Sequence, residues 1–261
     1  MNARSIADTV TLNNAVRMPI LGLGVWKMHD GDETEQAVRA ALKVGYRHID
    51  TATLYGNEAS VGRAVRASRI PREELFVTTK LWPTDFFTPQ KAFEESLERL
   101  GFEYVDLYLI HWPIPFMPKS VWMALEDIYA KKLARSIGVS NYDIKDIEKL
   151  LAYATVVPAI NQVKFSPFDH EKELLAYCRE KHVALEAYSP LTRGARFDDP
   201  TLTRIAKKYQ KSPAQILIRW CIEHEVIVIP KSSDPGRISE NADVFDFELA
   251  EEDLHALDSL G

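Results

Sequence analysis

The chain has 261 residues, of which 46% are hydrophobic and 27% charged, a balance typical of a folded globular protein rather than a disordered one. Its formal net charge of −6, with no long run of Lys or Arg, argues against a nucleic-acid-binding protein. No apolar stretch approaches the ~20 residues that a membrane-spanning helix needs. The first ten residues also lack the apolar segment of a secretion signal. We therefore expect a cytoplasmic protein that binds neither nucleic acid nor membranes.

Short apolar runs rich in β-branched residues alternate with amphipathic stretches along the whole chain. The first feature is a hairpin around Asn13 and Asn14, a pair of residues typical of tight turns. Several later runs are almost wholly apolar, which is typical of strands buried on both faces. The hairpin is predicted over residues 9–18, and the strands over residues 19–23, 47–50, 75–80, 105–111, 136–139, 159–163, 184–188 and 226–230.

Helices are predicted in the intervals between the strands. Two of them begin at a Thr-Pro or Ser-Pro pair, in which a capping hydroxyl precedes proline at the first helical position. These helices cover residues 33–44, 58–68, 89–100, 119–130, 144–153, 171–181, 213–223 and 236–242, and a last one covers residues 250–260.

Eight alternations of strand and helix favour a parallel sheet closed into a barrel. The alternative, an open doubly wound sheet that binds a dinucleotide, requires a G-x-G-x-x-G motif after its first strand. Gly22 and Gly24 follow that strand here, but the third glycine is missing. We therefore predict an α/β protein with one (β/α)8 TIM-barrel domain over residues 1–261, an N-terminal β-hairpin and an extra C-terminal helix.

Cysteines and histidines give no sign of a thiol or metal site. Cys178 and Cys221 lie far apart in helical contexts and form no C-x-x-C pair, so we interpret both as buried structural thiols. The seven histidines show neither H-x-H nor H-E-x-x-H spacing. No metal is expected.

Four ionisable side chains follow the predicted strands at the end of the barrel where active sites lie. They are Asp50, Tyr55, Lys80 and His111. Each alone has an ordinary structural explanation, but four in one barrel mouth point to a functional site. A free tyrosine has a pKa near ~10, and a neighbouring Lys80 ammonium would lower it. With Asp50 holding Lys80 and His111 orienting an oxygen, this set suits reduction of a carbonyl group.

Three long segments resemble hallmarks of the aldo-keto reductase family. Residues 45–58 read GYRHIDTATLYGNE, residues 104–113 read YVDLYLIHWP, and residues 229–232 read IPKS, followed by RISEN at 237–241. Residues 137–142, IGVSNY, are similar to a fourth. The matches run in family order over most of the chain.

The resemblance implies an NADPH-dependent aldehyde or ketone reductase without a Rossmann domain, with Asp50, Tyr55, Lys80 and His111 as the catalytic tetrad. It implies that Tyr188 stacks on the nicotinamide ring and that the carboxamide of the nicotinamide contacts polar side chains at the strand ends. The short loop after Trp112 suggests a member similar to the short bacterial reductases. A monomer is expected because the sequence shows no long apolar patch and no coiled-coil heptad. The implied cofactor contacts are Ser140, Asn141, Gln162, Tyr188, Ser189, Leu191, Lys231, Ser232, Arg237, Glu240 and Asn241, and the implied substrate contacts are Trp26, Trp82 and Trp112.

Two other function classes remain open at the level of sequence. A regulatory barrel like the potassium-channel β subunits would share the fold and bind the same cofactor without a metabolic role. A Schiff-base aldolase would use Lys80 as a nucleophile but leaves Lys231 and Arg237 unexplained. Asp234, between those two basic residues, would oppose a phosphate and so bears on the preference for NADPH over NADH.

Overall fold

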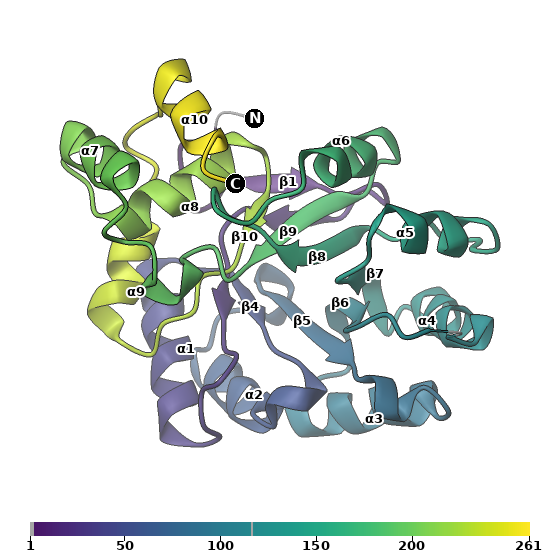
Figure 1. Cartoon of the computed structure of the whole chain (residues 1–261). Coiled ribbons are helices and arrows are strands. Elements are labelled where there is room, and N and C mark those ends of the chain that lie inside the picture. The colour runs from purple at the N-terminus through teal and green to yellow at the C-terminus, as the bar shows by residue number, and fades with distance from the viewer. Residues whose placement is uncertain (1–2, 116) are drawn as a thin grey trace.

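A parallel sheet of eight strands curls into a barrel with helices around it (Figure 1). The computed structural model describes residues 3–115 and 117–261. Leu21 bridges Val228, and the Gly22 amide donates to the Val228 carbonyl at 2.9 Å, so the first and last strands meet and close the barrel. The predicted (β/α)8 fold is confirmed. In sheet order the strands are β3 Leu23–Gly24, β4 His48–Asp50, β5 Phe76–Leu81, β6 Val105–Ile110, β7 Ala134–Ser140, β8 Ile160–Lys164, β9 Ala184–Tyr188 and β10 Ile227–Val228.

The barrel strands are buried as the apolar sequence runs predict. Every residue of β5 and β6 is buried, because helices cover the outer face and side chains fill the interior. The first predicted strand, residues 19–23, is wrong in its boundaries. Pro19 pairs with Thr9 in the hairpin instead, so the regular barrel strand begins only at Leu23.

The helices match the predictions with one omission, α7 (Pro200–Tyr209), for which no helix is predicted from the sequence. The Asp199 carboxylate caps this helix by accepting from the amides of Thr201 and Leu202, and Pro200 occupies its first turn. This is the same kind of start signal as at Thr88–Pro89, but only three residues of α7 are buried. The helices are α1 Asp32–Val44, α2 Glu58–Ala67, α3 Pro89–Leu100, α4 Lys119–Ala130, α5 Ile144–Leu151, α6 Lys172–Glu180, α7 Pro200–Tyr209, α8 Pro213–Glu223, α9 Pro235–Ala242 and α10 Glu251–Asp258.

The N-terminal hairpin lies at the end of the barrel opposite the site described below. Its strands, β1 Thr9–Thr11 and β2 Arg17–Pro19, pair antiparallel. In the turn, the Asn14 amide donates to the Arg135 carbonyl and the Ser136 hydroxyl, at the start of β7.

Cys178 and Cys221 are free, buried thiols on α6 and α8, as predicted. Among the described residues, no helix has both the length and the apolar character to cross a membrane.

A glycine sets the close contact between α2 and the end of α3. A Cβ added at Gly62 would collide with the backbone carbonyl of Leu100. We expect Gly62→Ala to lower the melting temperature, although alanine is normally the better helix former by about 1 kcal/mol. Overpacking of this kind costs about 1–3 kcal/mol. Thermal unfolding measures the effect, and a raised melting temperature would contradict this packing.

Candidate active site

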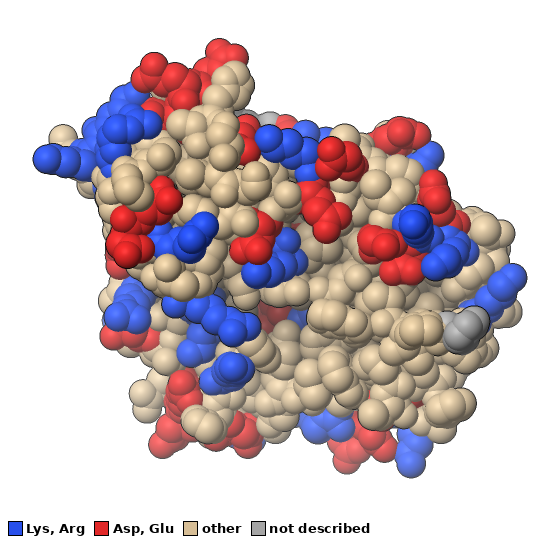
Figure 2. Space-filling model, viewed as in Figure 1, with Lys and Arg blue, Asp and Glu red and all other residues tan. Residues whose placement is uncertain are grey.

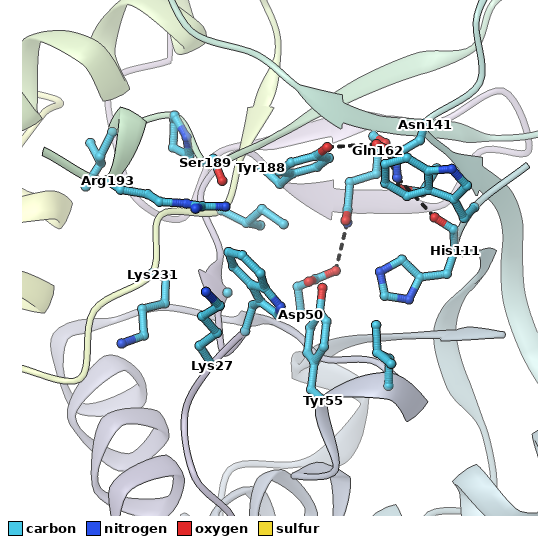
Figure 3. Close-up of a pocket in the computed structure, with 18 of the residues that line it drawn as sticks. Lys27, Asp50, Tyr55, His111, Asn141, Gln162, Tyr188, Ser189, Arg193 and Lys231 are labelled. Atoms are coloured by element: carbon cyan, nitrogen blue, oxygen red, sulfur yellow. Dashed lines mark hydrogen bonds between the residues drawn. The ribbon is translucent and has the colours of Figure 1, made fainter. Parts of the chain in front are cut away.

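A cavity of about 510 Å³ opens at the carboxyl ends of the barrel strands (Figure 3). This is the end where parallel α/β barrels carry their sites. The strand ends and the loops that follow them supply its walls. The lining residues are Gly24, Trp26, Lys27, Asp50, Leu54, Tyr55, Trp82, His111, Trp112, Ser140, Asn141, Gln162, Tyr188, Ser189, Pro190, Leu191, Arg193, Ile229 and Lys231.

Lys80 lies behind the cavity wall and is completely buried. Its ammonium donates to Asp50 Oδ1 at 2.6 Å, to the Thr51 carbonyl at 2.8 Å and to the Tyr55 hydroxyl at 3.4 Å. Burial has the largest single effect and would lower the pKa of Lys80, but Asp50, Tyr55 and Glu186 together outweigh it and raise that pKa. Lys80 is therefore a fixed positive charge that touches the Tyr55 oxygen.

Tyr55 keeps its proton more tightly than the sequence suggests. The Lys80 ammonium does lower its pKa, as predicted, but burial has the larger effect and the pKa rises to about 12. The expectation of a net lowering is therefore wrong, because the phenol lies in a site with little water and the charged phenolate is disfavoured there. Tyr55 is a fully protonated donor at neutral pH, suited to an acceptor that becomes strongly basic.

His111 lies beside Tyr55 in the cavity wall as a neutral imidazole (Figure 3). Burial, and secondly the Lys80 charge, lowers its pKa to about 3. Its ring packs edge-on against Tyr55 and Trp82, with centroids 5.6 and 5.0 Å away. A neutral ring held in this way serves as a hydrogen-bond donor rather than as a charge. The structure thus brings all four predicted tetrad residues together.

Amide side chains connect the strand ends on the opposite wall. Asn141 donates to the His111 carbonyl at 3.1 Å and accepts from the Tyr188 hydroxyl at 2.8 Å. The Gln162 amide nitrogen donates to Asp50 Oδ2 at 2.8 Å, and the Ser140 hydroxyl donates to the Gln162 carbonyl. With its amide nitrogen engaged, Gln162 offers its side-chain oxygen as an acceptor toward the cavity.

One half of the mouth is cationic and the other is apolar. Lys27, Arg193 and Lys231 lie together on one side of the cavity, away from His111 (Figure 3). No described carboxylate forms an ion pair with any of the three. Figure 2 shows basic side chains on this part of the face and mostly uncharged surface on the other part. The cationic half is suited to an anionic group.

The three predicted tryptophans all line the cavity, in two different settings. Trp82 and Trp112 stand near His111, and Trp112 is 48% exposed at the rim. Trp26 belongs to the cationic half, where the Lys27 ammonium and the Arg193 guanidinium lie 4.6 and 4.9 Å from its ring. Such cation–π contacts fix both charges at the mouth.

Four of the predicted cofactor contacts lie outside the cavity lining, on or just before α9. Ser232 and Asn241 are buried, Glu240 is half-buried and Arg237 is exposed. The Asp234 carboxylate caps the helix by accepting from the Arg237 amide at 2.8 Å. That carboxylate consequently occupies the N-terminus of α9, where an anion would otherwise find free amides.

Several site residues are not predicted from the sequence. Neither Lys27 nor Arg193 is among the predicted contacts, although each lies within four residues of one on the same connecting segment. Glu186 and His48 are buried in the barrel interior, two residues before Tyr188 and Asp50 on β9 and β4. Side chains two apart on a strand share a face, so these acidic and basic residues inside apolar strands were a usable signal.

The comparisons with known proteins agree with this geometry. The aldo/keto reductase family model matches residues 20–261. The chain is 49% identical over 258 residues to a glyoxal reductase of Bacillus subtilis, with 98% of this chain and 94% of that protein covered. The chain belongs to the aldo/keto reductase family.

Solved structures of family members superpose closely on the fold. An aldo-keto reductase from a Medee basin deep-sea metagenome library aligns with a TM-score of 0.93 and 45% identity, over 97% of this chain and 94% of that one. A Bombyx mori aldo-keto reductase in complex with NADP aligns with a TM-score of 0.90 and 39% identity, over 97% and 92% of the two chains. Family membership supports carbonyl reduction with a nicotinamide cofactor.

Proposed function

We propose that this protein is an NADPH-dependent reductase of aldehydes and ketones, with Tyr55 as the proton donor. The observation that carries the proposal is the contact between the Tyr55 hydroxyl and the buried Lys80 ammonium beside the cavity. We also propose that it acts as a monomeric enzyme in the cytoplasm. The glyoxal reductase among its relatives favours small aldehydes and dicarbonyls as substrates.

In the proposed mechanism, the carbonyl oxygen lies between the hydroxyl of Tyr55 and the imidazole of His111. When bound, the reduced nicotinamide supplies the hydride that attacks the carbonyl carbon. Negative charge then develops on oxygen, where the two donors stabilise it. Tyr55 releases its proton to that oxygen, and Lys80 stabilises the resulting phenolate. Trp82 and Trp112 line the apolar half of the cavity that receives the rest of the substrate.

The residues of the cavity fit a nicotinamide dinucleotide. The unpaired cations Lys27, Arg193 and Lys231 would hold its phosphates, a role for which guanidinium and ammonium groups are well suited. The Gln162 side-chain oxygen would accept from the carboxamide, and the Tyr188 ring would pack on the nicotinamide. Ser140, Asn141, Ser189 and Leu191 complete this wall, while Ser232, Arg237, Glu240 and Asn241 would contact the adenosine end.

A direct test is a panel of aldehydes and ketones assayed by the loss of NADPH absorbance. Turnover would distinguish a reductase from a regulatory barrel that only binds the cofactor. Trapping with borohydride tests the aldolase alternative, since only a Schiff base on Lys80 would be fixed covalently. Cofactor binding without turnover of any carbonyl would refute the proposal.

Tyr55→Phe is expected to reduce turnover by about 10²- to 10⁴-fold, the usual contribution of a general acid. The ring that lines the cavity remains, so NADPH should still quench tryptophan fluorescence with nearly unchanged affinity. Tyr177→Phe, on α6, is the matched control and should turn over normally. A Tyr55→Phe enzyme within about tenfold of the wild-type rate would exclude the proton-donor role.

Lys80→Met is expected to reduce turnover about as much as Tyr55→Phe does, because it changes the acidity of Tyr55. Removing the ammonium removes the one charge that lowers the pKa of Tyr55, so this pKa should rise further and the phenol become a weaker donor. Loss of one partner also leaves Asp50 buried without its counter-charge, so thermal unfolding must accompany the kinetics. A normal rate with an unchanged pH–rate profile would show that Lys80 is only structural.

Arg237→Met is expected to weaken NADPH binding by about tenfold or more while sparing NADH, because one charge-assisted bond to the 2′-phosphate is worth roughly 1.5–3 kcal/mol. Raised salt should reproduce part of the loss. The Asp234 carboxylate opposes the preference from the end of α9. Fluorescence titration with both cofactors measures the two affinities. Equal weakening of NADPH and NADH binding would show that Arg237 stabilises the barrel and does not contact the 2′-phosphate.

A further inference from the structure

Behind the tetrad lies a second buried polar cluster, whose carboxyl and imidazole groups the proposed mechanism does not use. It consists of Glu186 on β9, His48 on β4 and the amide of Gln162 on β8. Gln162 and Glu186 are neighbours in the sheet register, and the Gln162 amide nitrogen donates to Glu186 Oε2 at 2.8 Å. The same nitrogen donates to Asp50 Oδ2 at 2.8 Å. One amide therefore joins Glu186 directly to the carboxylate that holds Lys80.

The other oxygen of Glu186 has no hydrogen-bond partner among the described residues. Glu186 Oε1 is buried and lies 3.6 Å from His48 Nε2. His48 is neutral, since burial, and secondly Lys80, lowers its pKa to about 3. A buried carboxylate oxygen beside a neutral imidazole lacks the compensation that a full negative charge requires. A carboxylic acid proton would give this oxygen a role, as a donor toward His48 Nε2, which also lies 3.2 Å from the Thr78 hydroxyl oxygen.

The charges at the centre of the barrel also favour a protonated, neutral Glu186. Asp50 and Glu186 face a single ammonium, Lys80, and that ammonium is already bound to Asp50 at 2.6 Å. Two carboxylates that share one counter-charge in a dry site do not both ionise easily. Burial, and secondly the charge of Asp50, raises the pKa of Glu186 to about 8.

We propose that Glu186 is a positioning residue that is held as a neutral acid in the active enzyme, and that its ionisation weakens Tyr55 as a proton donor. This inference rests on the proposed function. Ionised Glu186 would add a second negative charge behind Lys80 and so disfavour the phenolate that Tyr55 becomes when it gives up its proton. Reduction therefore slows as pH rises through the titration of Glu186.

Among the described groups that face Glu186, Asp50 is the other carboxyl group. Burial raises the pKa of Asp50 as well, against the opposing Lys80 charge, and the 2.6 Å contact with Lys80 keeps the negative charge on Asp50 and the proton on Glu186. His48 and Asp50 face it from β4, Lys80 from β5 and Tyr55 from the short turn Thr53–Tyr55. The neighbouring strand β10, Ile227–Val228, contributes no ionisable group. The ligand atoms of His48, Asp50 and Glu186 lie within 4.8 Å of one another, but a metal ion bound there would meet the Lys80 charge on Asp50. A proton is the cation that fits.

The proposal is tested with Glu186→Gln, which keeps an oxygen for Gln162 but cannot ionise. The single-turnover rate of reduction by the wild-type enzyme should fall by about threefold or more between pH 7 and pH 9. A fall of this size is expected if ionisation of Glu186 raises the pKa of Tyr55 by about 1. The variant should lack this step. The matched control is Glu58→Gln, because Glu58 is equally buried but is paired with Arg99 at 2.7 Å on the outer side of the barrel. That control should keep the step.

An infrared titration follows the proton itself and needs no turnover. The wild-type protein should show the carbonyl stretch of a protonated carboxyl group at pH 7, the stretch should disappear by about pH 9 to 10, and Glu186→Gln should lack it. A wild-type protein without that band at pH 7, or identical pH–rate profiles for wild type and Glu186→Gln, would overturn the proposal. If the variant failed to fold, the wild-type titration alone would still decide whether a buried carboxyl group is protonated. A protein that reduced no carbonyl would refute the proposed function but leave the infrared result intact.

Discussion

The structure depends on the burial of one lysine charge at the centre of the barrel. An ammonium removed from water is costly unless its three protons find acceptors and its charge finds a partner. Lys80 has all of these, in the Asp50 carboxylate, the Thr51 carbonyl and the Tyr55 hydroxyl. Parallel pairing of β4 with β5 places Asp50 opposite Thr78, two residues before Lys80 on the same face of the strand. Strand β4 ends at Asp50, and the Thr51 carbonyl accepts from the Lys80 ammonium.

The properties of the cavity follow from that buried charge. The Lys80 charge lowers the pKa of His111 and so favours its neutral form, and it opposes the rise in the pKa of Tyr55 that burial causes. Because Lys80 is paired with Asp50, Glu186 has no counter-charge of its own. Gln162 spans the two carboxylates and thereby joins three strands in one hydrogen-bonded unit. The catalytic groups are consequently fixed by the core, whereas the cationic groups of the mouth lie on loops.

The repeating architecture was predictable because it depends on local patterns. Buried parallel strands need continuous apolar runs, and each crossover helix needs an amphipathic face and a start signal. Two segments are the exceptions. The helix Pro200–Tyr209 is not among the predicted helices although Asp199 and Pro200 mark its start, and the first predicted strand begins too early because Pro19 pairs within the hairpin.

The sequence by itself determined the fold class and the four tetrad residues that gather at the barrel mouth, because strand ends of a parallel barrel converge on one face whatever the details of packing. It did not indicate Lys27 and Arg193, which lie on the segments that follow the strands. Tertiary structure alone decided how those residues ionise. The pKa of Tyr55 reflects how much water is excluded around it, and the sequence shows its charged neighbour but not that exclusion. The pairing of Glu186 with Gln162, and of Asp234 with the end of α9, likewise depends on side-chain directions that only the packed barrel fixes.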